Sequence, residues 1–270
     1  NLNYADKDFY GQGLQVESYW RRADALFFPD LSRGRAGVSD NNSVQDVYGV
    51  RAAIDTQMPD IGSATGNLVW GADYDHETSR QRGDQYRVNG LSYTKTGTTF
   101  EMGPDIATAT KAIFGQLSYD IDDWTLRGGI RREWIESEVS DSIAYGEIVQ
   151  TGNRATLPGG TLKYDDTLYN LGAVYHLNEN QDVFVNFSQG FSLPDIQRFL
   201  RDVNSKYDIQ DLNAQALKVD SYELGWRGNW DKWLANVTAY ENTSDVTQFY
   251  DANDLSLIHI SEPTRLRRIS

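Results

Sequence analysis

The sequence has no cysteine and only 2 methionines and 3 histidines among its 270 residues. The absence of cysteine excludes a disulfide framework and cysteine-ligated zinc or iron–sulfur sites. No stretch approaches the roughly 20 consecutive apolar residues that a membrane-spanning helix needs, and the mean hydropathy is −0.58. These absences exclude helical membrane proteins. They do not exclude transmembrane β-barrels, whose lipid-facing and lumen-facing residues alternate and keep the average polar.

Positive charge is also in short supply. The formal net charge is −14, whereas a protein that binds nucleic acid presents a basic face to the phosphate backbone. We therefore expect no nucleic-acid partner. Aromatic residues, in contrast, reach 12%, with 7 Trp and 16 Tyr, and there are 23 glycines. This composition departs from that of an ordinary soluble domain.

Alternation of apolar and polar residues with a period of two predicts nine strands. The expected ranges are 12–28, 43–59, 65–82, 110–120, 123–139, 164–177, 181–191, 217–228 and 232–249. In the seventh of them, Val183, Val185 and Phe187 share one face, and Asn186 and Ser188 lie on the other. A β-sandwich also alternates, but here the second faces are polar or glycine. That pattern is typical of one face turned to lipid and one turned to a lumen.

The connections between these strands alternate in length. Short turns are expected near 59–66, 121–123, 178–181 and 228–231, and long polar connections at 30–42, 83–109, 140–165 and 193–216. Outer-membrane barrels have short periplasmic turns and long extracellular loops, and long structureless loops are uncommon in compact soluble domains. The sequence therefore predicts an all-β fold, a transmembrane antiparallel β-barrel.

Aromatic residues gather beside the short turns, at Tyr119, Trp124, Tyr175, Trp226, Trp230 and Trp233. Tyr and Trp favour the membrane–water boundary because each joins an apolar ring to a polar tip. We expect an aromatic girdle at this end of the barrel. The alternative is an aromatic core at the end of a soluble sandwich.

The last residues have a different character from the rest. Residues 255–265 (LSLIHISEPTR) resemble the in-frame translation of a transposase sequencing adaptor, with 266–270 as read-through. A natural amphipathic end is the alternative. We expect residues 1–254 to be part of the barrel domain and 255–270 to be an artefact of sequencing.

No catalytic or metal centre is expected. His76 and His176 have no matched ligand spacing, and no nucleophile motif surrounds Ser188 or Ser221. We therefore predict that the protein is not an enzyme and has no cofactor of its own.

Several segments resemble TonB-dependent siderophore receptors. Residues 184–195 (FVNFSQGFSLPD) are similar to a late barrel strand and the loop that follows it, and 217–227 (LKVDSYELGWR) and 233–249 to the next strands. Residues 68–76 (LVWGADYDH) and 158–160 (PGG) are similar in particular to the ferric aerobactin receptor branch. The resemblance covers residues 1–254.

The resemblance implies a 22-stranded barrel filled by an N-terminal plug domain, with a TonB-binding box ahead of the plug. Neither the plug nor the box lies within this sequence, so we expect an incomplete barrel of about nine strands. The implied function is binding and active import of a ferric siderophore across the bacterial outer membrane, with energy delivered by TonB. A passive outer-membrane porin and a soluble all-β binding module remain the alternatives.

The resemblance also implies partners: a ferric siderophore of the citrate–hydroxamate kind, TonB through the region outside this sequence, and outer-membrane lipid. Iron would enter only within the bound siderophore. Such a ligand is anionic, so arginine and aromatic side chains in the long loops suit it. The candidate contacts are Arg80, Arg82, Tyr86, Arg87, Tyr93, Arg198, Phe199 and Arg201. Each of them could instead be a solvated loop residue.

Overall fold

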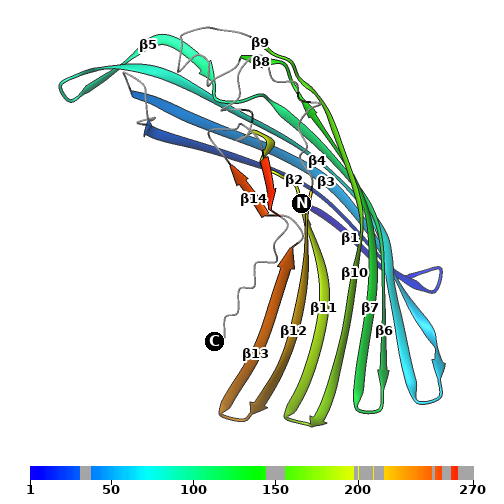
Figure 1. The fold of residues 1–270 in the computed structure, drawn as a ribbon. Helices are drawn as coiled ribbons and strands as arrows, with labels where there is room; N and C mark the ends of the chain where they lie inside the picture. Colours follow the sequence, from blue (N-terminus) through cyan, green and yellow to red (C-terminus); the bar gives the residue numbers. More distant parts are fainter. Residues whose placement is uncertain are drawn as a thin grey trace.

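The chain forms one large, strongly curved antiparallel sheet (Figure 1). This computed structural model describes residues 1–30, 38–143, 156–197, 200, 209 and 216–244, and the backbone of 247–250 and 257–260. Within these residues, no helix has both the length and the apolar character needed to cross a membrane.

The main sheet has 11 strands in the order β1-β2-β3-β4-β6-β7-β10-β11-β12-β13, with β5 paired to the outer part of β4. The strands are β1 (Leu2–Phe9), β2 (Gln12–Asp30), β3 (Val38–Ile61), β4 (Ala64–Asn89), β5 (Ser92–Glu101), β6 (Ile106–Ile121), β7 (Trp124–Val139), β10 (Gly160–Asn178), β11 (Gln181–Ser192), β12 (Leu217–Trp230) and β13 (Trp233–Ser244). Two further pairs stand apart, β8 (Ser142–Ile143) with β9 (Thr156–Leu157) and β14 (Thr247–Tyr250) with β15 (Leu257–Ile260).

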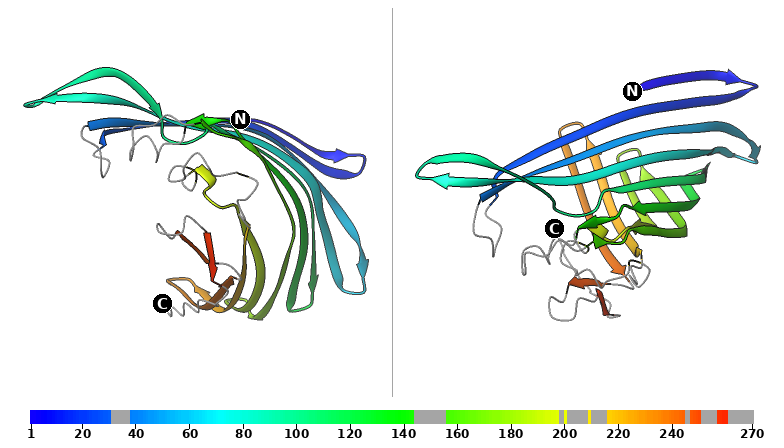
Figure 2. Two further views of the ribbon diagram at one scale, coloured as in Figure 1. Left: turned by 45° about the horizontal axis from the view of Figure 1, so that its top comes forward. Right: turned by 90° about the horizontal axis from the view of Figure 1, so that it is seen from above.

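The sheet curls about an axis without closing, and β1 and β13 lie at its two edges (Figures 1 and 2). The all-β antiparallel prediction is confirmed, and the described strands form an incomplete barrel wall. Short turns join the strands at one end, the periplasmic end of such a barrel. The residues near 196, drawn in yellow, lie inside the curve of the sheet (Figure 2).

The strand register gives the two faces of this wall their different chemistry. Ile130 on β7 pairs with Gly115 on β6, which pairs with Trp70 on β4, so these residues share the convex face. Their chain neighbours share the concave face, because successive side chains of a strand point to opposite sides. Arg131, for example, pairs with Phe114, which pairs with Gly71.

Large apolar side chains are exposed along the convex face. They include Val50, Trp70, Ile113, Leu117, Leu126, Ile130, Leu171, Val185, Leu224 and Val237. Soluble proteins rarely expose a contiguous apolar surface of this extent. The convex face is therefore suited to contact with lipid.

Aromatic side chains border this apolar band at both ends. Beside the short turns, the rings of Trp124 and Tyr175 lie 4.7 Å apart, and those of Trp226 and Trp230 lie 6.0 Å apart. Towards the other end, exposed aromatic residues recur at Tyr48, Trp134, Tyr169 and Tyr222. The sequence analysis predicted the first of these belts and missed the second.

The nine predicted strands are all present, but the number and the length of the strands in the N-terminal part were underestimated. β1 was not predicted, and most of the connection expected at 83–109 is a hairpin made by the end of β4 and β5. Asn89 pairs with Ser92 across a two-residue turn whose first residue, Gly90, has a φ of 61°. Glycine as the first of two turn residues, followed by a Thr-rich segment, is a recognised hairpin pattern.

The last predicted strand was too long, since β13 ends at Ser244 rather than at 249. β14 and β15 form their own two-stranded sheet. The boundary at residue 254 stays a prediction. Residues 31–37, residues 144–155 and nearly all of 198–215 lie outside the described residues. Large parts of three of the expected long connections are therefore not described.

Candidate functional site

On the concave face, a salt bridge near the middle of the wall links two strands that are not neighbours in the sheet. Arg131 on β7 donates to both carboxylate oxygens of Asp73 on β4, at 2.7 and 2.9 Å. β6 lies between the two strands, and its Ala112 pairs with Asp73 and is only 3% exposed. Because the side chain of Ala112 is small, the guanidinium of Arg131 can reach across β6 to Asp73. Bidentate arginine–carboxylate pairs are among the stronger polar contacts in proteins.

Other polar pairs continue this network over the concave face. Arg131 also contacts Glu133, and Arg51 approaches Asp73 at 3.6 Å. Nearer the short turns, Asp182 accepts from Arg227 and contacts His176, both at 2.6 Å. A wall that satisfies its charges internally is suited to an aqueous or protein-filled lumen and not to lipid.

A cavity of about 490 Å³, here called the inner chamber, opens on the concave face near the extracellular end. The wall side carries the hydroxyls of Ser43, Ser79 and Thr108. It also carries Gln45 and Glu77, whose side chains are hydrogen-bonded, with Gln45 Nε2 donating to Glu77 Oε1 at 2.6 Å. Residues 193–197 form the opposite side.

Ile196 and Gln197 hold this opposite side against the wall. Ile196 is buried with Val139 and Leu157, and Gln197 Nε2 donates to the Pro104 carbonyl at 3.0 Å. The inner chamber therefore offers hydroxyl and amide groups and two carboxylates, and its described lining holds no arginine or lysine.

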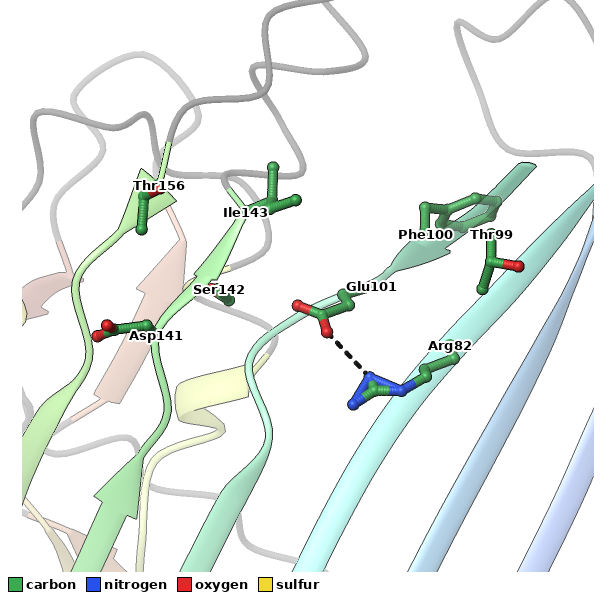
Figure 3. A pocket seen from close by; sticks show the side chains of 8 residues that line it. All are labelled: Arg82, Thr99, Phe100, Glu101, Asp141, Ser142, Ile143 and Thr156. Atoms are coloured by element: carbon green, nitrogen blue, oxygen red, sulfur yellow. Dashed lines mark hydrogen bonds and ion pairs between the residues drawn. The ribbon is translucent and has the colours of Figure 1, made fainter.

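A second cleft, of about 440 Å³, separates the β4–β5 hairpin from the β8–β9 pair (Figure 3). Arg82 lies in it and donates to Glu101 at 3.1 Å and to Asp105 at 2.8 Å. These two carboxylates flank the corner where the chain passes from β5 to β6. The guanidinium therefore holds the corner in place and has little charge left for an anionic ligand.

The base of the β4–β5 hairpin, which projects beyond the membrane-spanning part of the wall, is organised around buried Asp40. The carboxylate of Asp40 accepts from the Tyr86 hydroxyl at 2.8 Å and from the Asp84 backbone N–H at 2.7 Å. The hydrogen bond to Asp40 raises the pKa of Tyr86, because ionisation would place two negative charges together. Hydrogen bonds from Lys95 and Thr99 lower the pKa of Asp84, and the same contact with Asp84 raises the pKa of Lys95.

The predicted ligand residues do not form one cluster. Tyr86 and Tyr93 both pack against Phe28, at ring distances of 4.9 and 5.2 Å. Arg87 is exposed near the hairpin tip, and Arg82 is occupied in its own cleft. Arg80 pairs with Val44 in the same register as His76 with Tyr48, which places it on the convex face. Arg198, Phe199 and Arg201 lie outside the described residues.

Sequence reasoning missed the salt bridge between Asp73 and Arg131 and the hydroxyl-rich inner chamber. Both depend on which strands are neighbours and in which register, which alternation within one strand does not reveal. Among the residues that the structure describes, no group of three or more His, Cys, Asp or Glu side chains is placed to hold a metal ion.

Comparison with known proteins identifies the family of this wall. The family described as TonB dependent receptor-like, beta-barrel, matches residues 1–259. The chain belongs to this family. Its barrels lie in the bacterial outer membrane, and its members are transport receptors rather than enzymes.

Two receptors are similar over nearly the whole chain. The ferric aerobactin receptor of Klebsiella pneumoniae is 30% identical over 98% of this chain and 39% of its own length. The rhizobactin receptor of Rhizobium meliloti is 32% identical over 91% of this chain and 36% of its own length. The chain thus spans well under half the length of these relatives.

Solved structures agree with the fold. The ferric citrate transporter FecA in its unliganded form superposes with a TM-score of 0.69 at 16% identity, over 92% of this chain and 34% of FecA. The copper transporter OprC gives a TM-score of 0.64 at 17% identity, over 86% of this chain and 36% of OprC. At these identities the likeness concerns the fold alone.

The salt bridge between Asp73 and Arg131 yields a stability prediction for the complete protein that contains this chain. Asp73→Ala leaves the partly buried Arg131 without its bidentate partner, which should lower the free energy of unfolding by about 1–3 kcal/mol. Denaturant unfolding followed by tryptophan fluorescence measures the loss. Asp60→Ala, at an exposed strand end, is the matched control and should change stability by no more than about 0.5 kcal/mol. Equal effects of the two substitutions would contradict the account.

The contact between Tyr86 and Asp40 yields a pH prediction. Because the folded-state pKa of Tyr86 is raised, its stabilising effect is fully present below the ordinary value of 10.0 and is lost as the pH rises through the raised pKa. The phenolate absorbance that Tyr86→Phe removes should therefore titrate above pH 10.0. In Asp40→Asn this titration should move back towards the ordinary value. No movement would show that Asp40 is not the cause.

Proposed function

We propose that the complete protein binds a ferric siderophore at the extracellular side of the barrel and imports it with energy delivered by TonB. Membership of the TonB-dependent receptor family and the names of the two similar receptors support the class of ligand. The observation that carries the proposal is the polar concave wall with the inner chamber at its extracellular end. A plug domain and a TonB-binding box, both outside this sequence, are part of the proposal.

The proposed ligand is a siderophore of the citrate–hydroxamate kind. Receptors for ferric aerobactin and for rhizobactin are similar to this chain over nearly its whole length. The hydroxyl and amide groups of the inner chamber suit the neutral, hydrogen-bonding parts of such a chelate. Cationic groups for its carboxylates must come from elsewhere, since the described lining of the chamber has none.

For the cationic and aromatic contacts we propose the exposed part of the β4–β5 hairpin, where Arg87 and Tyr93 present side chains to solvent. Arg198, Phe199 and Arg201 remain proposed contacts on the grounds of sequence. Arg82 serves the corner between β5 and β6, and Arg80 lies on the convex face. We therefore place both of these arginines outside the ligand site.

The import function is tested by growth under iron limitation. A strain that lacks its own siderophore receptors and carries the complete gene should grow on ferric aerobactin and should stop growing when TonB is removed. Growth that persists without TonB would favour a passive porin. Growth on a ferric catecholate but not on aerobactin would overturn the proposed ligand class and leave active import standing.

The ligand contacts are tested by direct binding of the ferric siderophore to the purified complete receptor. Combined Arg87→Ala and Tyr93→Ala should weaken affinity by about tenfold, equivalent to about 1.4 kcal/mol, because a charge-assisted contact and an aromatic contact are lost together. Arg80→Ala is the control, being an exposed arginine of the same strand on the face opposite to Arg87. Equal loss in the control, or none in the double variant, would contradict the placement.

A further inference from the structure

The inner chamber has room for one part of a large ligand and not for the whole of it. Its volume is about 490 Å³, in the lower half of the range of roughly 300–1,000 Å³ that small-molecule sites occupy. Ala23 and Ala25 line it on β2, and Leu193, Pro194 and Ile196 line it on the opposite side. These small and apolar groups suit an alkyl segment, which gains dispersion contacts there.

The polar groups of the chamber lie in two rows, which the strand register sets at different depths. In the outer row, Gln45 on β3 pairs with Ser79 on β4. Two residues closer to the short turns, Glu77 pairs with Thr108 on β6, and Thr108 pairs in turn with Ser137 on β7. Glu77 therefore lies on the deep side of the chamber, towards the periplasm.

Hydrogen bonds determine what each of these polar groups can still offer. The Thr108 and Ser137 hydroxyls are bonded to each other at 3.0 Å. A carboxylate can only accept, so the amide nitrogen of Gln45 faces Glu77 and its carbonyl oxygen remains an acceptor. Among the described residues the hydroxyl of Ser79 has no partner, which leaves it able to donate to a ligand oxygen.

Glu77 has no cation beside it in the described part of the chain. Its hydrogen bond there comes from Gln45, and no ion pair reaches it. Arg21 lies in the same row but two strands away, beyond Val47, with its guanidinium 5.3 Å from the centre of the Tyr19 ring. The chamber is partly enclosed, so bulk water screens the charge of Glu77 less than it would on an open surface.

The opposite side of the chamber carries a second carboxylate, that of Asp195. An anionic group that entered would therefore approach like charges, with no cation in the described lining to offset the repulsion. An uncharged group would meet no such penalty. A site becomes specific by penalising the wrong ligand as well as by favouring the right one.

We propose that the inner chamber receives a hydroxamate arm of the ferric siderophore, whose charge the bound iron neutralises, and that Glu77 keeps carboxylates out. The alkyl part of the arm lies against the apolar lining, and Ser43 and Ser79 donate to its oxygens. The carboxylate-bearing citrate part faces outwards, towards the cationic contacts proposed on the β4–β5 hairpin. This inference rests on the proposed function, because it assigns an orientation to the proposed ligand.

The preference of the purified complete receptor for two chelates tests the role of Glu77. The probes are ferric aerobactin, a hydroxamate–citrate chelate, and ferric citrate, which has no hydroxamate; tryptophan fluorescence follows their binding. Glu77→Gln should raise the affinity for ferric citrate relative to that for ferric aerobactin by about tenfold, because a like-charge repulsion is removed. Asp46→Asn is the matched control. It removes one negative charge beside Gln45 on the opposite face and should leave this ratio unchanged.

A second variant tests which part of the ligand occupies the chamber. Ala23→Leu narrows the chamber without altering any charge and should weaken the binding of ferric aerobactin by about tenfold. Ala23→Ser keeps the space and should bind as the unaltered receptor does. Ala25→Leu replaces Ala23→Leu if that variant does not fold, as judged by the different gel mobility of heated and unheated barrel.

The possible failures are distinct. An unchanged preference in Glu77→Gln, or an equal change in Asp46→Asn, would overturn the role of Glu77. Full affinity for ferric aerobactin in the folded, chamber-narrowing variant would overturn the placement of the arm. Each of these results still describes a receptor that binds a ferric siderophore. If the unaltered receptor bound neither chelate, the proposed function would fail and this inference with it.

Discussion

The whole structure depends on the register of the backbone hydrogen bonds between its antiparallel strands. From β2 to β13, each pairing carries residues of one face onto residues of the same face in the next strand, as in the row Ile54, Trp70, Gly115, Ile130 and Tyr169. A shift of one residue would exchange the faces of a whole strand. Apolar groups would then enter the lumen and charges would enter lipid, which is costly in both directions.

The features of both faces follow from this register. On the concave face it brings Asp73 within reach of Arg131 across the small side chain of Ala112, and it aligns the hydroxyls of the inner chamber. On the convex face it aligns the small residues Ala52, Ala72 and Gly115, which leave a hollow of about 660 Å³ in the apolar band. Sequence neighbours such as Ile130 and Arg131 thus serve lipid and lumen respectively.

The fold was predictable because alternation is a local property. Val183, Val185 and Phe187 reveal a two-faced strand without knowledge of its neighbours, and the alternating loop lengths indicate a membrane barrel. The β4–β5 hairpin was missed because its strands are polar on both faces, although Asn89 and Gly90 mark the turn. The contacts of Arg82 and Arg131 were beyond prediction, since each reaches a carboxylate whose proximity only strand order determines.

The central claim, that the convex face meets lipid and the concave face does not, is open to a direct measurement, and this chain contributes no cysteine of its own. Single cysteines placed along β11 in the complete protein can carry spin labels in lipid vesicles. Labels at 183, 185 and 187 should be relaxed by oxygen, which concentrates in the bilayer, and labels at 182, 184, 186 and 188 should not. Accessibility without this two-residue period, or with the opposite phase, would contradict the account.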